Sequence, residues 1–326
     1  MLRHGWLAAL AMVAITGAIV IGPRGMVLSL VTDDPVETRI LTEVRLPRVT
    51  LAFVAGATLA TAGMAFQALF RNALATPYTL GVSAGASLGA AIYVHMGITT
   101  SVAGIPGHAF AALGGALISI ALVYAVARAT YGFSSSTLLL AGVAVSFLFT
   151  SVILAIQYVG DVTTSFRIGR WLLGGLEVVG FLPVMHVLPF AMVGITTVLA
   201  ISRNLDLLVV GEESAAARGV DVPAVKKLIF AAASLMVGGV VATCGPIGFV
   251  GLVVPHIGRI MLGPRHRTLG PFSVLAGGTF LVACDTVART VVAPIEIPVG
   301  IITALIGGPF FLGILVQGHA GKQFRG

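Results

Sequence analysis

The groups in this sequence that could do chemistry are gathered mainly in one charged insertion, residues 203–223. It contains the run Gly211-Glu212-Glu213-Ser214-Ala215-Ala216-Ala217-Arg218-Gly219, in which acidic side chains lie close to a basic one. The glycine between the two short stretches can adopt a positive φ and so form a turn. Because the rest of the chain offers few polar places to meet a soluble partner, this insertion is interpreted as a docking element.

Other reactive side chains are scattered. Asp285 lies four residues before Arg289, the spacing of a local ion pair on one helix face. His95 and His108 fall in one expected outer loop and are interpreted as solvated rather than as ligands of a metal or haem. Cys244 and Cys284 lack CxxC spacing and are expected to be small buried hydrophobes.

Several catalytic signatures are missing from the sequence. It has no GxxxxGK[ST] phosphate loop, so the chain is not expected to bind ATP itself, and it has no HExxH or GxSxG. The apolar runs hold no pair of carboxylates that would suggest a proton or sodium relay. No metal and no cofactor is therefore predicted in this chain, and it is not expected to be an enzyme.

Composition places these residues in a membrane protein. Hydrophobic residues make up 57% of the chain and charged residues 10%, and the mean hydropathy is +1.05. Such a chain cannot present a polar surface to water on all sides, and a lipid bilayer suits it better. Strand-like alternation is absent, so the prediction is an all-α integral membrane protein with residues 1–326 as one transmembrane domain.

Ten apolar runs predict ten spans. They are Trp6–Ile21, Val49–Phe70, Leu80–Val94, Ala111–Val126, Leu138–Val159, Leu182–Ile201, Leu228–Thr243, Phe249–Leu262, Phe272–Val292 and Gly300–Val316. The first run lacks a clear A-x-A cleavage site and is interpreted as an uncleaved helix. With the amino terminus inside, twelve Lys and Arg residues face the cytoplasm and seven face outward, which favours a multi-pass inner-membrane protein with both termini cytoplasmic. The net charge of +7 is explained by this bias, and no nucleic-acid partner is predicted.

Glycine and proline mark tight packing and interruptions. Gly81, Gly85 and Gly89 recur every four residues and are expected to line a helix face that packs closely. Gly245-Pro246-Ile247-Gly248 precedes a short apolar stretch, and Gly307-Gly308-Pro309 falls inside the last span. Both are places where helices inside a membrane protein can break.

Long motifs resemble one known family. They are Arg45-Leu46-Pro47-Arg48; Gly56 and Gln67; Arg71-Asn72-Ala73-Leu74-Ala75-Thr76-Pro77; Leu80-Gly81-Val82 with Gly85-Ala86; Leu138-Leu139-Leu140-Ala141-Gly142-Val143; Gly211-Glu212-Glu213; Gly245 to His256; Asp285 with Ala288-Arg289; and Glu296-Ile297-Pro298-Val299-Gly300 with Thr303-Ala304. In this order the chain resembles the FecCD-type permease subunits of type II ABC importers for ferric siderophores, haem and vitamin B12. Ala73 and Gly175 depart from the usual proline and serine of that family.

The resemblance implies an assembly. A second permease subunit, identical or related, would form a translocation path with this chain, two ATPase subunits carrying ATP and Mg would bind on the inside, and a periplasmic or lipoprotein substrate-binding protein would bind on the outside. Residues Leu205 to Val220 would form two short coupling helices on the ATPase. The coupling residues carried over are Leu205, Leu208, Gly211, Glu212, Glu213, Ala215, Arg218 and Gly219.

Two further sets of residues are carried over from the family. Arg45, Arg48 and Arg289 would meet acidic residues of the binding protein as exposed ion pairs, each contributing about 0–1 kcal/mol, so that charge reversal should little affect folding; anchoring to the membrane surface is the alternative. Asn72, Leu74, Ser135 and Ser136 would narrow the path on the cytoplasmic side, while helix capping is an equally good interpretation of the two serines.

Two other functions remain open at this stage. An ion-gradient-driven secondary transporter would need intramembrane acids, of which Asp285 is the one candidate in a late span, and a membrane-embedded enzyme would need a convergent set of catalytic groups. Within the importers, the substrate is not legible from the sequence.

Overall fold

The computed structural model of the protein describes residues 12, 14–19, 21–22, 25–26, 35–73, 75–76, 81–102, 104–129 and 135–323, and the side chains of 21–22, 25–26, 135–136, 315 and 317–323 are outside this description. The elements are α2 (Pro35–Ile40), the π-helical turn η1 (Leu41–Arg45), α3 (Leu46–Leu69), α4 (Val82–His95), α5 (Gly107–Ala129), α6 (Ser135–Val159), α7 (Val162–Leu172), α8 (Leu182–Ala200), α9 (Ser202–Val210), α10 (Glu212–Ala217), α11 (Val222–Cys244), α12 (Val250–Leu262), α13 (His266–Thr290) and α14 (Val299–Gln323). Two antiparallel pairs of two-residue strands, β1 (Ile21–Gly22) with β2 (Gly25–Met26) and β3 (Ser101–Val102) with β4 (Ile105–Pro106), lie in connections.

Nine of the ten predicted spans each coincide with one helix of this bundle. Six helices are long and apolar enough to cross a bilayer, and the shorter apolar helices are Val82–His95, Val250–Leu262 and Val299–Ile314. The first predicted span, Trp6–Ile21, falls mostly outside the described residues, where Met12 and residues 14–19 are helical. The all-α membrane fold predicted from composition is therefore confirmed.

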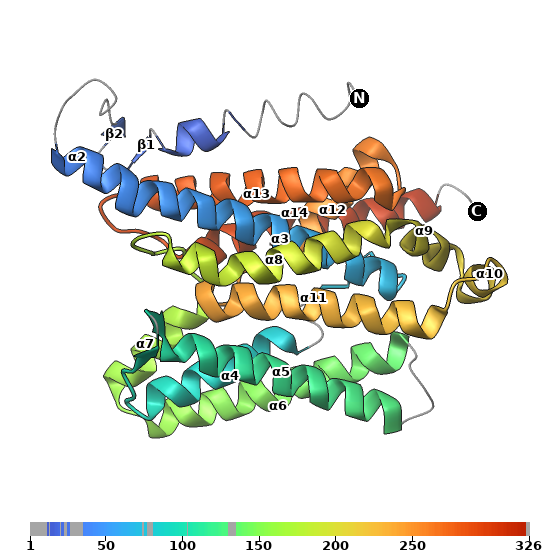
Figure 1. The fold of residues 1–326 in the computed structure, drawn as a ribbon, viewed down its shortest axis with the longest axis horizontal. Coiled ribbons are helices and arrows are strands. Elements are labelled where there is room, and N and C mark those ends of the chain that lie inside the picture. Colours follow the sequence, from blue (N-terminus) through green and yellow to red (C-terminus); the bar gives the residue numbers. More distant parts are fainter. Residues whose placement is uncertain are drawn as a thin grey trace.

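The long helices run side by side along the longest axis, and the bundle has two distinct ends (Figure 1). At one end lie α2, η1 and α7, and at the other lie α9 and α10. We call these the α7 end and the α10 end.

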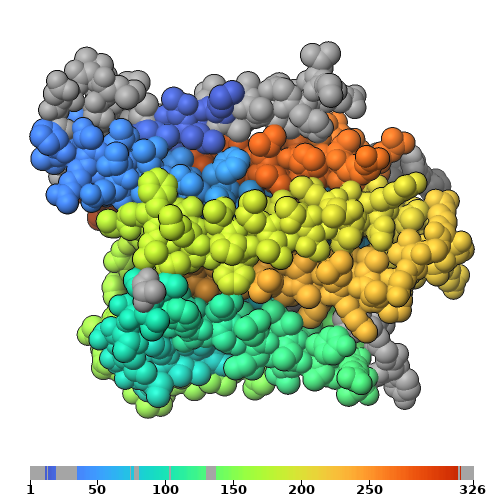
Figure 2. All heavy atoms as spheres, in the orientation of Figure 1, coloured from blue at the N-terminus to red at the C-terminus, as the bar shows by residue number. Residues whose placement is uncertain are grey.

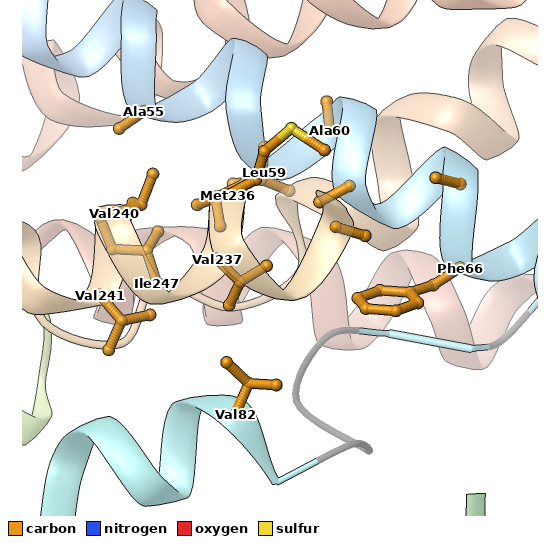
Figure 3. Packing of buried hydrophobic residues seen from close by; sticks show 14 of the residues in the cluster. Ala55, Leu59, Ala60, Phe66, Val82, Met236, Val237, Val240, Val241 and Ile247 are labelled. Atoms are coloured by element: carbon orange, nitrogen blue, oxygen red, sulfur yellow. The ribbon is translucent and has the colours of Figure 1, made fainter. Parts of the chain in front are cut away.

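Helix α3 is the centre of the packing. It is buried around nearly its whole circumference and packs against α8, α11, α12 and α13. Leu59 and Ala60 of α3 gather with Met236, Val237 and Val240 of α11 in one apolar cluster (Figure 3). Lipid tails are as apolar as these side chains, so this contact stabilises the bundle through close van der Waals packing between the two helices.

Glycines permit close approach between helices, as the sequence predicted. A Cβ on Gly85 would meet the backbone oxygen of Gly115 in α5, and one on Gly89 would meet that of Ala111. On α3, Gly63 lies against the backbone of Gly251 in α12. Without such small residues the backbones could not come this near.

Two local predictions were wrong, and one helix was missed. Helix α14 continues through Gly307-Gly308-Pro309 instead of breaking there. Helix α13 begins at His266, six residues before the predicted start, because Pro271 is accommodated within it. The amphipathic helix α7 was not foreseen; it is capped by Asp161, whose side chain accepts from the backbone N–H of Thr164 at 2.9 Å.

Candidate functional site

The polar segment, residues 203–223, forms α9, α10 and the turn into α11, and it protrudes at the α10 end of the bundle (Figures 1 and 2). Asp221 ends the segment by capping α11, accepting from the backbone N–H of Ala224 at 3.0 Å. The sequence prediction of two short helices here is confirmed. Gly211, which connects them, has a positive φ, as predicted (φ 159°, ψ 148°), and Gly219 after α10 is left-handed at φ 81°.

The predicted coupling residues divide into an inner and an outer set. Leu205, Leu208 and Ala215 are buried against the bundle, so they hold the two short helices in place. Glu213, Arg218 and Gly219 are exposed. Sequence reasoning missed Val209 and Val210, which are 41% and 70% exposed at the end of α9, although two adjacent valines before a glycine are an unusual ending for a solvated helix.

Two ion pairs join the polar segment to the long helices. Glu212 of α10 lies 2.6 Å from Nζ of Lys226 in α11, a lysine that is nearly fully buried. Asp206 of α9 lies at the start of α13, where its Oδ1 accepts from the backbone N–H of His266 and contacts Nδ1 of the same residue, both at 2.7 Å. Of these four residues, the sequence analysis assigned a role to Glu212 alone, and not to Lys226, Asp206 or His266.

A polar hollow of about 620 Å³ lies beside these contacts, between α9 and the turn that follows α10. Its lining includes Arg203, Asn204, Leu207 and Arg218. The polar segment therefore exposes two valines at the end of α9, and two arginines line its hollow.

The predicted gate residues are only partly described. Asn72 follows α3, where its backbone N–H donates to the carbonyl of Gln67 at 3.1 Å. Leu74 lies outside the described residues, and Ser135 and Ser136 begin α6 with side chains outside the description. Whether these four residues meet stays a prediction.

A polar contact between α3 and α12 was not predicted. Gln67 accepts from the guanidinium of Arg259 and donates to the backbone oxygen of Gly251 at 3.2 Å. These hydrogen bonds hold the last turns of α3 against α12. A polar Gln in an otherwise apolar run was the available signal.

At the α7 end, five charged residues form what we call the arginine cluster: Arg45, Arg48, Asp285, Arg289 and Glu296. Arg48 binds both acids, with Nε 3.0 Å from Oδ1 of Asp285 and Nη1 2.6 Å from Oε2 of Glu296. Arg289 lies 3.0 Å from Oδ2 of Asp285, which confirms the local ion pair predicted from their spacing.

The backbone also supplies partners to the arginine cluster. Arg45 donates to the carbonyl of Ile19 at 3.1 Å, and Arg289 donates to that of Ala18 at 3.2 Å. The cluster thus joins the helical residues 14–19 to α3 and α13.

The expectation that these arginines form exposed surface pairs is wrong. Arg45, Arg48 and Arg289 are 7%, 7% and 3% exposed, and Asp285 is 1% exposed. Buried guanidinium groups need internal counter-charges, and the two acids provide them. A cavity of about 370 Å³, lined by Arg45, Arg48, Arg289 and Glu296 among others, reaches them.

Beside this cavity is a wider hollow of about 1130 Å³, which shares Arg48 and Glu296 with it. Its opposite wall is α7 with residues 173–179, including Phe166, Arg170 and Glu177. Arg170 and Glu177 form an exposed ion pair at 2.7 Å that raises the pKa of the arginine.

The expected outer-loop histidines are not in one loop. His95 ends α4, and His108 lies in the first turn of α5 with its ring 6.5 Å from that of Tyr93. Among the residues that the structure describes, no three His, Cys, Asp or Glu side chains are grouped so that they could hold a metal ion. Cys244 and Cys284 are free and buried, as predicted.

The fold and these two polar ends define a multi-pass helical membrane permease. The family model of the FecCD transport family matches residues 6–317, and the chain belongs to that family. It is therefore the permease component of an ABC importer, as the motifs in its sequence predicted.

Individual relatives agree with this assignment. The chain is 43% identical to the uncharacterized ABC transporter permease protein YvrB of Bacillus subtilis (strain 168), covering 90% of this chain and 84% of that protein. It is 44% identical to the cobalamin import system permease protein BtuC of Halobacterium salinarum, covering 83% and 72%. It is 36% identical to the hemin transport system permease protein HmuU of Yersinia pestis, covering 84% and 82%.

A solved structure has the same fold. It is an inward-facing conformation of a transporter assigned to the metal-chelate type of ABC transporter, with a TM-score of 0.86 and 31% sequence identity, covering 95% of this chain and 97% of that one.

Proposed function

We propose that this chain imports a metal chelate, haem or a cobalamin, with ATP hydrolysed on separate ATPase subunits that bind the polar segment. The observation that carries the proposal is the polar segment itself. Its inner residues are packed into the bundle, while Val209, Val210 and Arg218 are exposed, and Arg218 also lines the hollow. An apolar patch with positive charge, fixed on a rigid base, suits a soluble partner better than it suits water.

The experiment for this interface is co-purification with the ATPase subunit of the importer. Val210→Glu places a charge on the exposed patch and should abolish co-purification while leaving the bundle folded. Val316→Glu introduces the same charge at an equally exposed valine (70% for both) on α14. Retention of the ATPase by the Val210→Glu variant would refute the interface.

The substrate class is supported by the relatives that transport cobalamin, hemin, Fe(3+)-citrate and iron(3+)-hydroxamate. Proteoliposomes holding the permease, its ATPase and its binding protein should take up one of cobalamin, haemin or a ferric hydroxamate when ATP is enclosed. Uptake that continues without the ATPase would favour a secondary transporter. That alternative has little support, because Asp285 is held between two arginines and is poorly placed as a relay for ions.

The binding protein is proposed to dock at the α7 end. Since Arg45, Arg48 and Arg289 are buried, the interaction we propose differs from exposed surface pairing: a carboxylate of the binding protein enters the 370 Å³ cavity that these arginines line. Arg45→Gln should weaken binding of the purified partner, with a larger loss at low salt because screening is weaker there. Arg39→Gln, an exposed arginine of α2, is the control; equal losses in both variants would argue against the cavity.

Orientation follows from the same proposal. The α10 end would be cytoplasmic and the α7 end outside, consistent with twelve against seven basic residues. Ser214→Cys and Thr163→Cys place thiols at opposite ends, and the native cysteines are buried and should stay unlabelled. A membrane-impermeant maleimide added to intact cells should label only Thr163→Cys.

We propose that α6 forms part of the interface with a second permease subunit. Leu140, Phe147 and Tyr158 are 72%, 71% and 92% exposed on this helix. A second permease, identical or related, would cover such a face; disulfide cross-linking of Phe147→Cys in membranes tests for the identical copy.

A further inference from the structure

We infer that Asp206 and Lys226 are positioning residues for transport, which bind the polar segment to α13 and α11 so that its displacement moves these helices. Part of this inference rests on the proposed function, because it takes the polar segment as the element that the ATPase displaces.

The first connection is a helix cap supplied from another helix. The residue before α13, Arg265, gives that helix no side-chain cap, and Asp206 of α9 accepts from the backbone N–H of His266 instead. The first N–H groups of a helix lack partners within it and carry partial positive charge, so a carboxylate there is favoured twice. The same oxygen contacts Nδ1 of His266, which is 1% exposed. A short surface helix is thereby fixed to the start of a long one.

The second connection is the pair of Glu212 with Lys226. Gly211 provides no side chain to cap α10, and Glu212 in the first turn points to a lysine that is 5% exposed. A buried ammonium group needs a counter-charge, so removing Glu212 would leave the charge of Lys226 uncompensated, and removing Lys226 would release the carboxylate from α11. Glu212 is thus committed to its own chain, and its role is internal rather than a direct contact with the ATPase.

The two helices that the polar segment contacts, α13 and α11, both extend to the α7 end. Helix α13 runs from His266 to Asp285 in the arginine cluster, roughly 28 Å away at about 1.5 Å per residue. Helix α11 ends at Cys244, whose carbonyl accepts from the backbone N–H of Gly175 at 2.8 Å. Gly174, next in that loop, accepts from the N–H of Gly300 at the start of α14. Packed helices move as rigid bodies, so each connection couples the two ends of the molecule.

The test has two readouts. Hydrogen–deuterium exchange of residues 203–219 in the purified permease measures whether the segment is fixed, independently of any ATPase. Asp206→Ala and Lys226→Met should each raise exchange there by roughly ten- to hundredfold, since hydrogen bonds to charged groups are among the stronger ones. Lys227→Met, an exposed neighbour, is the matched control and should change nothing.

Transport supplies the second readout. In proteoliposomes containing the ATPase, the amount of cobalamin, haemin or ferric hydroxamate imported per ATP should fall severalfold in Asp206→Ala and Lys226→Met, although the ATPase still co-purifies. Asp206→Asn keeps an oxygen acceptor and should recover much of the loss. The exchange Glu212→Lys with Lys226→Glu should likewise restore part of it.

Three results would overturn the inference: unchanged exchange in both variants, raised exchange with normal import per ATP, or an equal effect of Lys227→Met. Loss of the ATPase is a separate outcome, tested by Val210→Glu, and it would bear on the proposed interface instead. Whether or not the ATPase is lost, the hydrogen–deuterium exchange of residues 203–219 tests whether Asp206 and Lys226 hold the polar segment to α13 and α11.

Discussion

Removing the carboxylate of Asp285 should destabilise the protein far more than removing an exposed one. Asp285 is 1% exposed and neutralises two arginines, Arg48 and Arg289, whose side chains are 8% and 3% exposed. In Asp285→Asn, Arg48 keeps its direct ion pair with Glu296, but the hydrogen bonds that Arg289 retains go to neutral groups: the carbonyls of Ala18 and residue 285 and the hydroxyl of Thr286. Breaking a buried ion pair costs about 3–5 kcal/mol because it leaves a buried charge uncompensated.

The matched control is Glu177→Gln. Glu177 pairs with Arg170 at 2.7 Å, a similar distance, but the two side chains are 48% and 60% exposed. Such a pair contributes about 0–1 kcal/mol, so the two variants should differ by at least about 2 kcal/mol, or roughly 30-fold in the unfolding equilibrium. The assay is denaturant unfolding of the purified chain in detergent, followed by circular dichroism.

A double variant locates the cause of the loss. Asp285→Asn combined with Arg289→Gln removes the uncompensated charge, so its cost should be less than the sum of the two single costs. Strict additivity, or unfolding free energies of Asp285→Asn and Glu177→Gln that agree within about 0.5 kcal/mol, would refute the assignment of the arginine cluster as a stabilising network.

Three further outcomes are expected. Gly63→Ala should cost about 1–3 kcal/mol, since its Cβ would enter the backbone of α12, whereas Gly114→Ala, which meets nothing, should be neutral; unfolding in detergent compares them. Gly219→Ala should loosen α10 by about 1 kcal/mol because its φ is 81°, and Gly211→Ala should also introduce strain, since L residues rarely adopt its φ of 159°; proteolysis of the polar segment would reveal either change. The backbone N–H groups of α7 lower the pKa of Asp161 below its usual 3.8. The cap therefore stabilises α7 above pH 3.8, and this stabilisation is lost as the pH falls through the lowered pKa. Hydrogen–deuterium exchange of the α7 amides, measured against pH, should show this loss in the native chain and not in Asp161→Ala.

The sequence was sufficient for the spans because hydropathy is a local property. An apolar run bounded by charged residues reads as a membrane helix whatever its neighbours are, and nine runs coincide with helices for that reason. Local spacing also predicted the pair of Asp285 with Arg289. Helix α7 was not predicted because it is only 11 residues long and mixes arginines with apolar residues.

The side chains that pair across long stretches of sequence could not be predicted, because such pairing depends on tertiary structure. Arg48 meets Asp285 across 237 residues of sequence, and His266 meets Asp206 across 60. The arginines predicted to lie on the outer side were recognised as exceptions to the charge bias and were assigned to the surface, since hydropathy does not distinguish a buried charge with a partner from an exposed one. Two arginines near an intramembrane acid are a signal for an internal network, and the expected cost of burying a charge supports that interpretation over an exposed one.

The ion pairs at the two ends of the bundle differ in a way that bears on mechanism. At the α7 end, Asp285 is sealed from water between two guanidinium groups. At the α10 end, the carboxylates of Asp206 and Glu212 keep 30% and 41% of their side-chain surface exposed. An ion pair open to water is weaker and exchanges partners more readily than a buried one. The contacts at the α10 end should therefore be the first to respond when the polar segment is displaced. As long as Asp206 stays bound to His266, the displacement reaches α13, which Asp285 holds to the arginine cluster.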